Sequence, residues 1–180
     1  MDSLREKKYI VVKNFLDKNE CNLILNYLLK KHKLNTTDFD EIQNNNGDSY
    51  FSKDPMTEAL LFMKHKKMEE LTGIELYPTY SFSRVYTSNA ILKKHTDRPS
   101  CEISITIMFG SCKTHDWPIY MGEEKITLES GDAVIYLGCE IPHGRDAFEG
   151  DFHMQGFLHY VDRNGPNAEY KYDKRLESSV

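Results

Sequence analysis

Two segments between residues 17 and 73 have apolar positions at a helical spacing, whereas the segments after Gly73 have a strand spacing. Asp17, followed three residues later by Glu20, forms a capping box, which predicts that a helix begins here and runs to about Lys33. The apolar residues of this helix, spaced i, i+3, i+4 and i+7, are Cys21, Ile24, Leu25 and Leu28. The Val- and Ile-rich segment over residues 8–15 predicts a strand before this helix.

A polar segment separates this helix from a second one. Residues 35–52 carry the sequence NNNGD at their centre, and we interpret them as a mobile loop with the role of a lid over a site. The second helix is predicted from Pro55 to about Gly73, because proline suits a first helical turn and glycine suits a helix end.

Six segments after Gly73 alternate or are rich in strand-forming residues, and Gly, Pro, Asn and Asp punctuate them. They read LYPTYSFSRVYT, CEISITIMFG, WPIYMG, KITLE, GDAVIYLG and FHMQGFLHYV. Short strands without intervening helices predict a double-sheet β-barrel. We therefore expect a mainly β chain with N-terminal helices, forming one domain over residues 1–180. Its helical support spans about 17–73 and its β core about 75–162, and the polar tail after Asp162 is expected to fray.

The composition of the chain disfavours some kinds of binding partner, such as nucleic acid and membranes. Of the 180 residues, 39% are hydrophobic and 28% charged, which is typical of a globular chain. The net charge of -5 disfavours a general nucleic-acid-binding surface. We expect no membrane partner and a cytoplasmic protein, because the sequence shows neither a secretory signal nor a run of 18 apolar residues. The four cysteines form no C-x-x-C pair, so reduced thiols are expected rather than a zinc finger.

A candidate metal site begins with His95 and Asp97, which stand one residue apart before an apolar run. Alternate positions at a strand end point to one face, so both side chains can bind one ion. The alternative is a solvated turn without chemistry. His143, 48 residues after His95, supplies a third ligand. Two histidines and one carboxylate suit non-haem Fe(II) with open coordination positions, and zinc is the competing metal.

The ordered motifs extend beyond these ligands. YSFSRVYTSNAILKKHTDRPSCEISITI, GDAVIYLGCEIPHGRD and QGFLHYVD resemble the 2-oxoglutarate- and Fe(II)-dependent dioxygenases, most closely their prolyl-4-hydroxylase-like branch. The resemblance covers roughly residues 79–162 and implies a double-stranded β-helix (jelly-roll, cupin-like) core. It also implies that His95, Asp97 and His143 hold Fe(II), and that 2-oxoglutarate binds beside the metal as co-substrate. It implies no catalytic residue beyond the metal ligands.

The co-substrate anchor departs from the pattern of this branch. The branch usually has Arg or Lys nine or ten residues after the second histidine, where this chain has Phe152 and His153. A buried dicarboxylate still requires a cation, and arginine matches it best. Arg145 is the first candidate, with a salt bridge to a neighbouring carboxylate as its alternative role, and Arg84 is the second. Tyr86 resembles the tyrosine that hydrogen-bonds the co-substrate in this family.

Roles are also predicted for four further polar residues, with two alternatives each for Arg98 and Glu102. Arg98 either meets an anionic substrate at the mouth of the site or lies on the surface. Glu102 is a candidate hydrogen-bond acceptor for His95 or a partner for Arg98. His153 is assigned to the cofactor pocket, and His159 to the core as a hydrogen-bonded histidine.

The activity implied by the resemblance is hydroxylation of a substrate C–H bond, with O2 consumed and succinate and CO2 released from 2-oxoglutarate. A prolyl residue in a peptide or protein is the first substrate predicted by the branch, with ascorbate as a reductant. Two alternatives stay open from the sequence. One is a dioxygenase that acts on nucleic-acid bases or a free amino acid. The other is a non-enzymatic cupin-like barrel that binds a metal or a small ligand.

Overall fold

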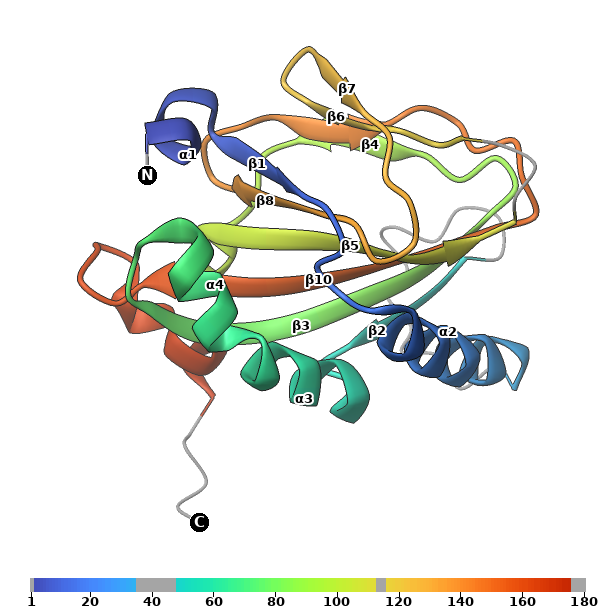
Figure 1. Cartoon of the computed structure of the whole chain (residues 1–180), viewed down its shortest axis with the longest axis horizontal. Helices are drawn as coiled ribbons and strands as arrows, with labels where there is room; N and C mark the ends of the chain where they lie inside the picture. The colour runs from blue at the N-terminus through green and yellow to red at the C-terminus, as the bar shows by residue number, and fades with distance from the viewer. Residues whose placement is uncertain (1, 35–47, 113–115, 176–180) are drawn as a thin grey trace.

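Two antiparallel β-sheets form the core of the computed structural model, which describes residues 2–34, 48–112 and 116–175. The strands of the larger sheet are β1 (Tyr9–Val12), β2 (Ser49–Ser52), β3 (Leu76–Thr87), β5 (Ile103–Ser111), β8 (Ala133–Leu137) and β10 (Phe152–Asp162). Those of the smaller sheet are β4 (Leu92–His95), β6 (Ile119–Met121), β7 (Glu124–Ile126) and β9 (His143–Arg145). Their orders are β1-β8-β5-β10-β3-β2 and β4-β9-β6-β7, and the smaller sheet lies over one end of the larger (Figure 1).

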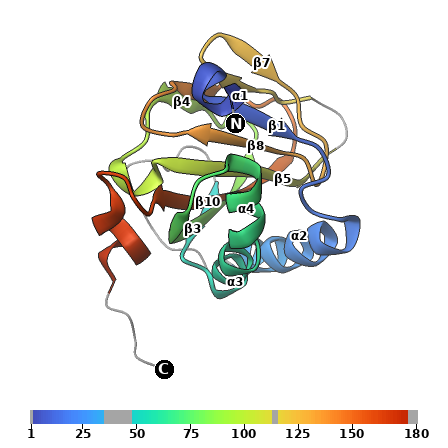
Figure 2. The ribbon, with the colours of Figure 1, turned by 60° about the vertical axis from the view of Figure 1, so that its left-hand side comes forward.

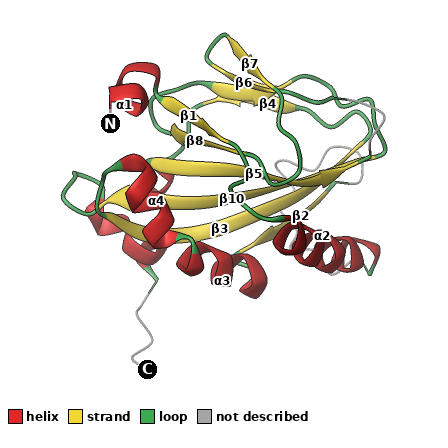
Figure 3. Cartoon of the chain, in the orientation of Figure 1, coloured by secondary structure: helices red, strands yellow, loops and turns green. Residues whose placement is uncertain are grey.

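The helices lie on the face of the larger sheet that points away from the smaller sheet (Figures 2 and 3). They are α2 (Lys18–Lys33), α3 (Pro55–Met63) and α4 (His65–Thr72), while α1 (Asp2–Lys7) precedes β1. Short 3-10 segments, η1 (Pro99–Cys101) and η2 (Ala168–Lys174), complete the described elements. No described helix is long and apolar enough to cross a membrane.

Alternation along β5 sorts side chains between the two faces of the larger sheet. Ile103, Ile105 and Ile107 are fully or almost fully buried and belong to the cluster that packs against the helices. Ser104 and Thr106 point to the opposite, inner face, toward the smaller sheet, and are also buried. Both faces of the central strand are therefore covered, and the inner face carries polar groups where a site can form.

The predicted helix at the N-terminus is confirmed, and the second one is divided. Asp17 caps α2, accepting hydrogen bonds from the backbone of Asn19 and Glu20, and the Glu20 side chain accepts from the Asp17 N–H. The single helix predicted over 55–73 is wrong in one respect, because α3 and α4 meet at Lys64. Gly73 ends α4 in the left-handed conformation, with φ of 70°.

Two predictions about loops need correction. The end of the predicted 35–52 loop is the strand β2, which pairs with β3, whereas residues 35–47 lie outside the described residues. The tail after Asp162 does not fray over its described part, because η2 packs against β3. Arg175 holds this segment in place by donating to Glu58 at 2.8 Å and to the carbonyl of Thr79 at 2.7 Å.

Candidate metal centre

Pairing between two short strands brings together histidines that are distant in the sequence. His95 ends β4 and His143 begins β9, and the two residues are direct partners across this antiparallel pair. Their ring centroids lie 4.5 Å apart. His143 follows the strand β8 in the chain but belongs to β9, a separate strand in the smaller sheet.

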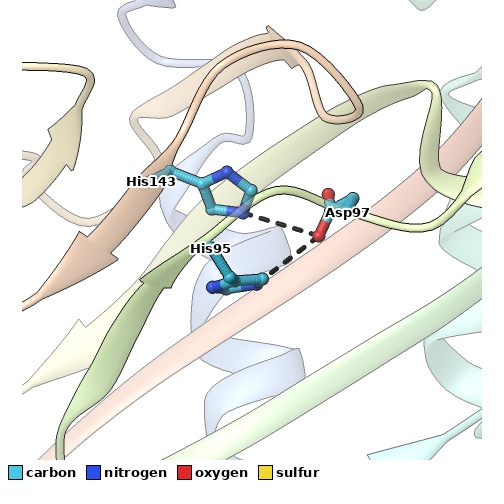
Figure 4. Close-up of side chains that lie close together, drawn as sticks. All are labelled: His95, Asp97 and His143. Atoms are coloured by element: carbon cyan, nitrogen blue, oxygen red, sulfur yellow. Dashed lines mark ion pairs between the residues drawn. The ribbon is translucent and has the colours of Figure 1, made fainter.

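The two histidines direct the same nitrogen toward one carboxylate oxygen. His95 Nε2 lies 3.6 Å and His143 Nε2 3.5 Å from Oδ1 of Asp97 (Figure 4). The Nδ1 atoms lie 2.7 Å from the carbonyl of Lys93 and 3.0 Å from that of Ile141, respectively. Because a carbonyl only accepts hydrogen bonds, each Nδ1 donates a proton to its carbonyl, and each Nε2 is directed toward Asp97 as the ring atom that would bind a metal. The three donor groups lie within 4.8 Å of one another, which suits a single ion.

Asp97 is an ionised carboxylate with an unsatisfied buried oxygen. Burial by itself would raise the pKa of Asp97, but His143 and His95 outweigh it and hold this pKa well below its usual range. Oδ2 of Asp97 is buried without a hydrogen-bond partner. The Asp97 N–H donates to the carbonyl of Gly138 at 2.8 Å, which fixes the turn. Since buried polar atoms are normally satisfied, this orphaned oxygen fits a metal ligand.

A second donor group shares the same carboxylate. The ligand atoms of Asp97, Cys101 and His159 also lie within 4.8 Å of one another. Burial raises the pKa of the Cys101 thiol to about 12, and the thiol lies 3.1 Å from the Tyr80 hydroxyl. A metal needs the thiolate, so this set is a poorer site than the two histidines with Asp97.

A cavity of about 490 Å³ opens beside the His95, Asp97 and His143 triad. Its wall combines aromatic rings with a few polar groups. The lining residues are Tyr50, Ser52, Tyr80, Phe82, Arg84, Tyr86, Leu92, His95, Asp97, Arg98, Cys101, Tyr136, His143, Phe157 and His159. This volume lies within the usual range for small-molecule sites.

Arg145 is a buried cation with spare hydrogen-bond donors. It stands two residues after His143, one Nη atom donates to the carbonyl of Trp117, and the guanidinium lies 4.7 Å from the centroid of the Trp117 ring. Its Nε and other Nη atom are buried and have no hydrogen-bond partner. Burial lowers the pKa of Arg145 to about 10, so the side chain stays charged at neutral pH. Tyr86 lines the cavity, and Arg145 is not among the described residues that line it.

Arg84, the second candidate anchor, already has a carboxylate partner. Its Nη2 and Nε lie 2.6 Å and 3.1 Å from Oδ2 of Asp48. The guanidinium also stacks 4.6 Å from the centroid of the Tyr86 ring. Arg84 therefore lies in the cavity wall as one half of an ion pair with Asp48. Arg145, by contrast, has two buried nitrogen atoms without a hydrogen-bond partner.

A polar network near Arg145 includes Gln155 and Thr106, which the sequence does not predict. His153 Nε2 lies 2.8 Å from the amide oxygen of Gln155, and the Gln155 amide nitrogen donates to Thr106 at 2.7 Å. Burial, followed by the charge of Arg145, lowers the pKa of His153 to about 3, so this imidazole is neutral at pH 7. The two-residue period that links Gln155 to His153 was the signal in the sequence that could have revealed Gln155.

Three other predicted roles can be compared with the structure. His159 is a buried histidine hydrogen-bonded to Ser104 at 2.8 Å, as predicted, and it also lines the cavity. Both roles proposed for Glu102 are wrong, because its carboxylate accepts from the backbone N–H of Asp162 at 2.9 Å. Arg98 lines the cavity while its side chain is 51% exposed, so the structure is compatible with both roles predicted for it.

The arrangement of two facing antiparallel sheets is shared with solved structures of 2-oxoglutarate- and Fe(II)-dependent oxygenases. The predicted double-stranded β-helix fold is therefore confirmed. The epimerase SnoN from nogalamycin biosynthesis superposes with a TM-score of 0.73 at 13% identity, over 99% of this chain and 89% of that chain. No family model and no curated protein sequence matches the chain.

Two prolyl hydroxylases share the fold as well. The viral collagen prolyl hydroxylase vCPH from Paramecium Bursaria Chlorella virus-1, in complex with 2-oxoglutarate, superposes with a TM-score of 0.67 at 14% identity, over 87% of this chain and 96% of that chain. The Pseudomonas putida prolyl-4-hydroxylase gives a TM-score of 0.65 at 16% identity, over 88% and 95% of the two chains. At these identities the likeness defines the fold.

Proposed function

We propose that this protein is an Fe(II)- and 2-oxoglutarate-dependent oxygenase that hydroxylates a C–H bond of its substrate. The observation that carries the proposal is the convergence of His95 Nε2 and His143 Nε2 on one carboxylate oxygen of Asp97. Fold neighbours with iron or 2-oxoglutarate bound support the choice of metal and co-substrate. We further propose that residues 1–180 act as one domain, since the helices pack directly on the larger sheet.

The donor set of the residues present fits a metal ion that would keep open coordination positions. His95, Asp97 and His143 would hold it, and the bound metal would supply the activation of O2 that C–H hydroxylation requires. Zinc would find the same donors, although catalytic zinc sites more often use His₂Glu or His₃. A barrel that only stores a metal would have no need for Arg145, a buried cation with two unsatisfied nitrogens.

We assign the binding of 2-oxoglutarate to polar residues inside the barrel. Arg145 would pair with the distal carboxylate of 2-oxoglutarate, and the hydroxyl of Tyr86 would donate to it. His153 is neutral and cannot replace the missing cation of the prolyl-hydroxylase pattern. Trp117 and Phe148, whose ring centroids lie 4.9 Å apart, cover this end of the barrel and would keep water out.

Removal of one ligand tests the proposal. We expect Asp97→Ala to abolish iron-dependent formation of succinate from 2-oxoglutarate, because the two histidines alone leave the ion without its charged ligand. Succinate is measured with and without Fe(II) for both proteins. Asp116→Ala serves as the control, since this exposed carboxylate lies outside the triad. Succinate formation by Asp97→Ala at the wild-type rate would contradict the assignment.

The anchor is tested separately. Replacing Arg145 with Met keeps much of the side-chain volume and removes the charge, so we expect the KM for 2-oxoglutarate to rise about 100-fold or more. Arg145→Lys should restore part of the affinity, because it returns the charge without the forked geometry. An unchanged KM in both variants, measured by succinate formation, would transfer the anchoring role to Arg84.

The substrate is not decided by the fold. The prolyl residue in a peptide that the sequence resemblance predicts stays a prediction, and two fold neighbours are prolyl hydroxylases. Other neighbours act in nogalamycin biosynthesis. The net charge of -5 continues to disfavour nucleic acid.

A further inference from the structure

A carboxylate of the chain itself lies between two cations, one of which lines the cavity. Asp173, on η2, accepts from Arg98 Nη1 at 2.9 Å and lies 3.0 Å from Lys53 Nζ. Its side chain is only 10% exposed. Arg98 follows Asp97 directly in the chain and lines the cavity. The site next to the triad therefore already binds a carboxylate through two basic side chains.

Tyr80 connects this carboxylate site to the cavity. The guanidinium of Arg98 lies 4.7 Å from the centroid of the Tyr80 ring, and Lys53 Nζ lies 5.7 Å from it. Tyr80 also lines the cavity. Cations that stack on one aromatic ring are held in a fixed orientation, so an anion that replaced Asp173 would find both of them in place.

The backbone around Asp173 is strained. Tyr172, Asp173 and Lys174 have φ of 51°, 55° and 57°, a left-handed conformation that is unfavourable for each residue with a Cβ atom. Lys53 has φ of 56° as well. The ion pairs of Asp173 are therefore formed at a conformational cost, and a competing carboxylate would not bear that cost.

A continuous row of rings leads from β2 toward the triad. Tyr50 stacks on Phe82 with centroids 5.8 Å apart and an interplanar angle of 17°, and Phe82 lies 6.0 Å from Phe157. The Phe157 ring is nearly parallel to that of His159, at 6° and 6.4 Å. His159 in turn has a ring nitrogen within 4.8 Å of the Asp97 carboxylate. Planar molecules pack well on such a surface.

This wall is a poor match for an extended peptide. A peptide brings a backbone N–H and C=O at nearly every residue, and these groups need hydrogen-bond partners when they are buried. The rings of Tyr50, Phe82 and Phe157 offer few such partners, and Tyr50 and Phe157 are buried. A compact ligand with one apolar ring and one charged end would satisfy the wall and the two cations together.

We propose that the primary substrate is a small molecule that combines a planar ring with a carboxylate. Its ring packs on the row formed by Tyr50, Phe82 and Phe157, and its carboxylate displaces Asp173 from Arg98 and Lys53. This inference rests on the proposed oxygenase function, because it assumes that a C–H bond of the ligand is brought to the metal. It selects a different substrate class from the prolyl peptide.

Three matched probes test the ligand chemistry. Binding of 3-phenylpropanoate, its neutral amide and 3-cyclohexylpropanoate is measured by calorimetry on the full chain with Fe(II) and 2-oxoglutarate under anaerobic conditions. We expect the aromatic acid to bind about tenfold more tightly than the amide, which lacks the charge, and more tightly than the non-planar acid. Equal affinities for acid and amide, or tighter binding of a proline-rich peptide, would overturn the inference.

Three variants locate the site. Arg98→Gln should remove the preference for acid over amide, leaving the two within about twofold. Asp173→Asn should strengthen binding of the acid by roughly threefold or more without changing that of the amide, because the competing carboxylate is gone. Glu169→Gln is the matched control on η2, since its ion pair with Lys174 is exposed and does not include Arg98. An Arg98→Gln protein that keeps the full preference would place the carboxylate elsewhere.

Two separate measurements distinguish failure of this inference from failure of the proposed oxygenase function. Succinate formed by the wild-type protein from 2-oxoglutarate and Fe(II), without any added substrate, tests the oxygenase. The calorimetric preference tests the ligand class. Absence of succinate together with a clear acid preference would reject the oxygenase alone, and succinate without the preference would reject the ligand class alone. Melting curves of each variant confirm folding, and the three probes on the wild-type chain decide the inference if a variant does not fold.

Discussion

Gly138 is the residue on which the position of Asp97 depends most closely. A Cβ atom at Gly138 would lie 2.5 Å from Oδ2 of Asp97 and 2.2 Å from the carbonyl oxygen of Cys101. Both distances are far shorter than a van der Waals contact, and one of the two atoms is backbone. The turn can therefore hold the carboxylate between the two histidines because residue 138 has no side chain.

This dependence gives a prediction for Gly138→Ala. The added methyl group should push the Asp97 side chain out of place and weaken metal binding by roughly 10- to 100-fold, as loss of supporting contacts does at other metal sites. Affinity is measured by titration with Co(II) and its visible spectrum. Cys139→Ala, a change in the next residue that adds no atoms, should leave the affinity unchanged. A Gly138→Ala protein with the wild-type affinity for the metal would show that the turn can shift to accommodate the methyl group.

The sequence indicates some site residues and not others for physical reasons. His95 and Asp97 could be chosen because a two-residue spacing fixes their relative direction, and His143 because it follows a strand in the expected order. The two-residue period relates Gln155 to His153, but its hydrogen-bond partner Thr106 lies 49 residues away on another strand, and no local pattern reveals that contact. The ion pair of Arg84 is equally remote, since its partner Asp48 lies 36 residues away.

At the level of elements, the N-terminus of α2 shows how local chemistry fixes a boundary. Asp17 Oδ1 accepts from the N–H groups of Asn19 and Glu20 at 2.7 and 2.9 Å, and Glu20 returns a bond to the N–H of Asp17 at 2.9 Å. These contacts satisfy groups that the first helical turn otherwise leaves unpaired. The boundary was predictable because all of its partners lie within four residues.

Loss of the Asp17 cap should lower the free energy of unfolding by a measurable amount. Asp17→Ala removes the acceptor for two backbone N–H groups, and we expect the free energy of unfolding to fall by about 1 kcal/mol. Urea denaturation followed by circular dichroism gives this value. Lys18→Ala, in the same exposed turn, is the control and should change stability by less than about 0.5 kcal/mol. A smaller effect of Asp17→Ala than of the control would mean that solvent replaces the cap.

Other elements were harder to predict because they depend on partners elsewhere in the chain. The strands β4 and β9 have four and three residues, too few for a clear alternation, and they exist as a pair. The segment after Asp162 reads as a polar tail, yet Arg175 docks on Glu58, which lies 117 residues away. The long strands β3, β5 and β10, by contrast, carry enough apolar residues to be recognised from sequence.

Across the whole molecule, the buried imidazole of His153 links stability to pH. Burial, with a smaller contribution from the charge of Arg145, lowers the pKa of His153 to about 3 in the folded protein. In the unfolded chain a histidine has a pKa of about 6.5. Between these values the unfolded chain binds a proton that the folded protein does not, so folding is favoured fully above pH 6.5 and progressively less as the pH falls toward 3.

Replacement of the His153 imidazole should make the free energy of unfolding less dependent on pH. Between pH 7 and pH 5 we expect the fall in unfolding free energy to be smaller by roughly 2 kcal/mol in His153→Gln than in the wild-type protein. Guanidinium denaturation of the metal-free protein at both pH values provides the comparison. His32→Gln, at a partly exposed histidine, is the control. An equal fall in the wild-type and His153→Gln proteins would mean that residue 153 is protonated when folded.

The three ligands differ greatly in their contact with solvent. The side chain of His95 is 42% exposed, whereas those of Asp97 and His143 are 13% and 3% exposed. An ion held by this set would begin to dissociate on the side of His95, since that imidazole can swing into water while the other two stay fixed. Chelating agents would therefore strip the metal quickly and without unfolding the chain, and the same metal-free protein would reload as soon as the ion was returned.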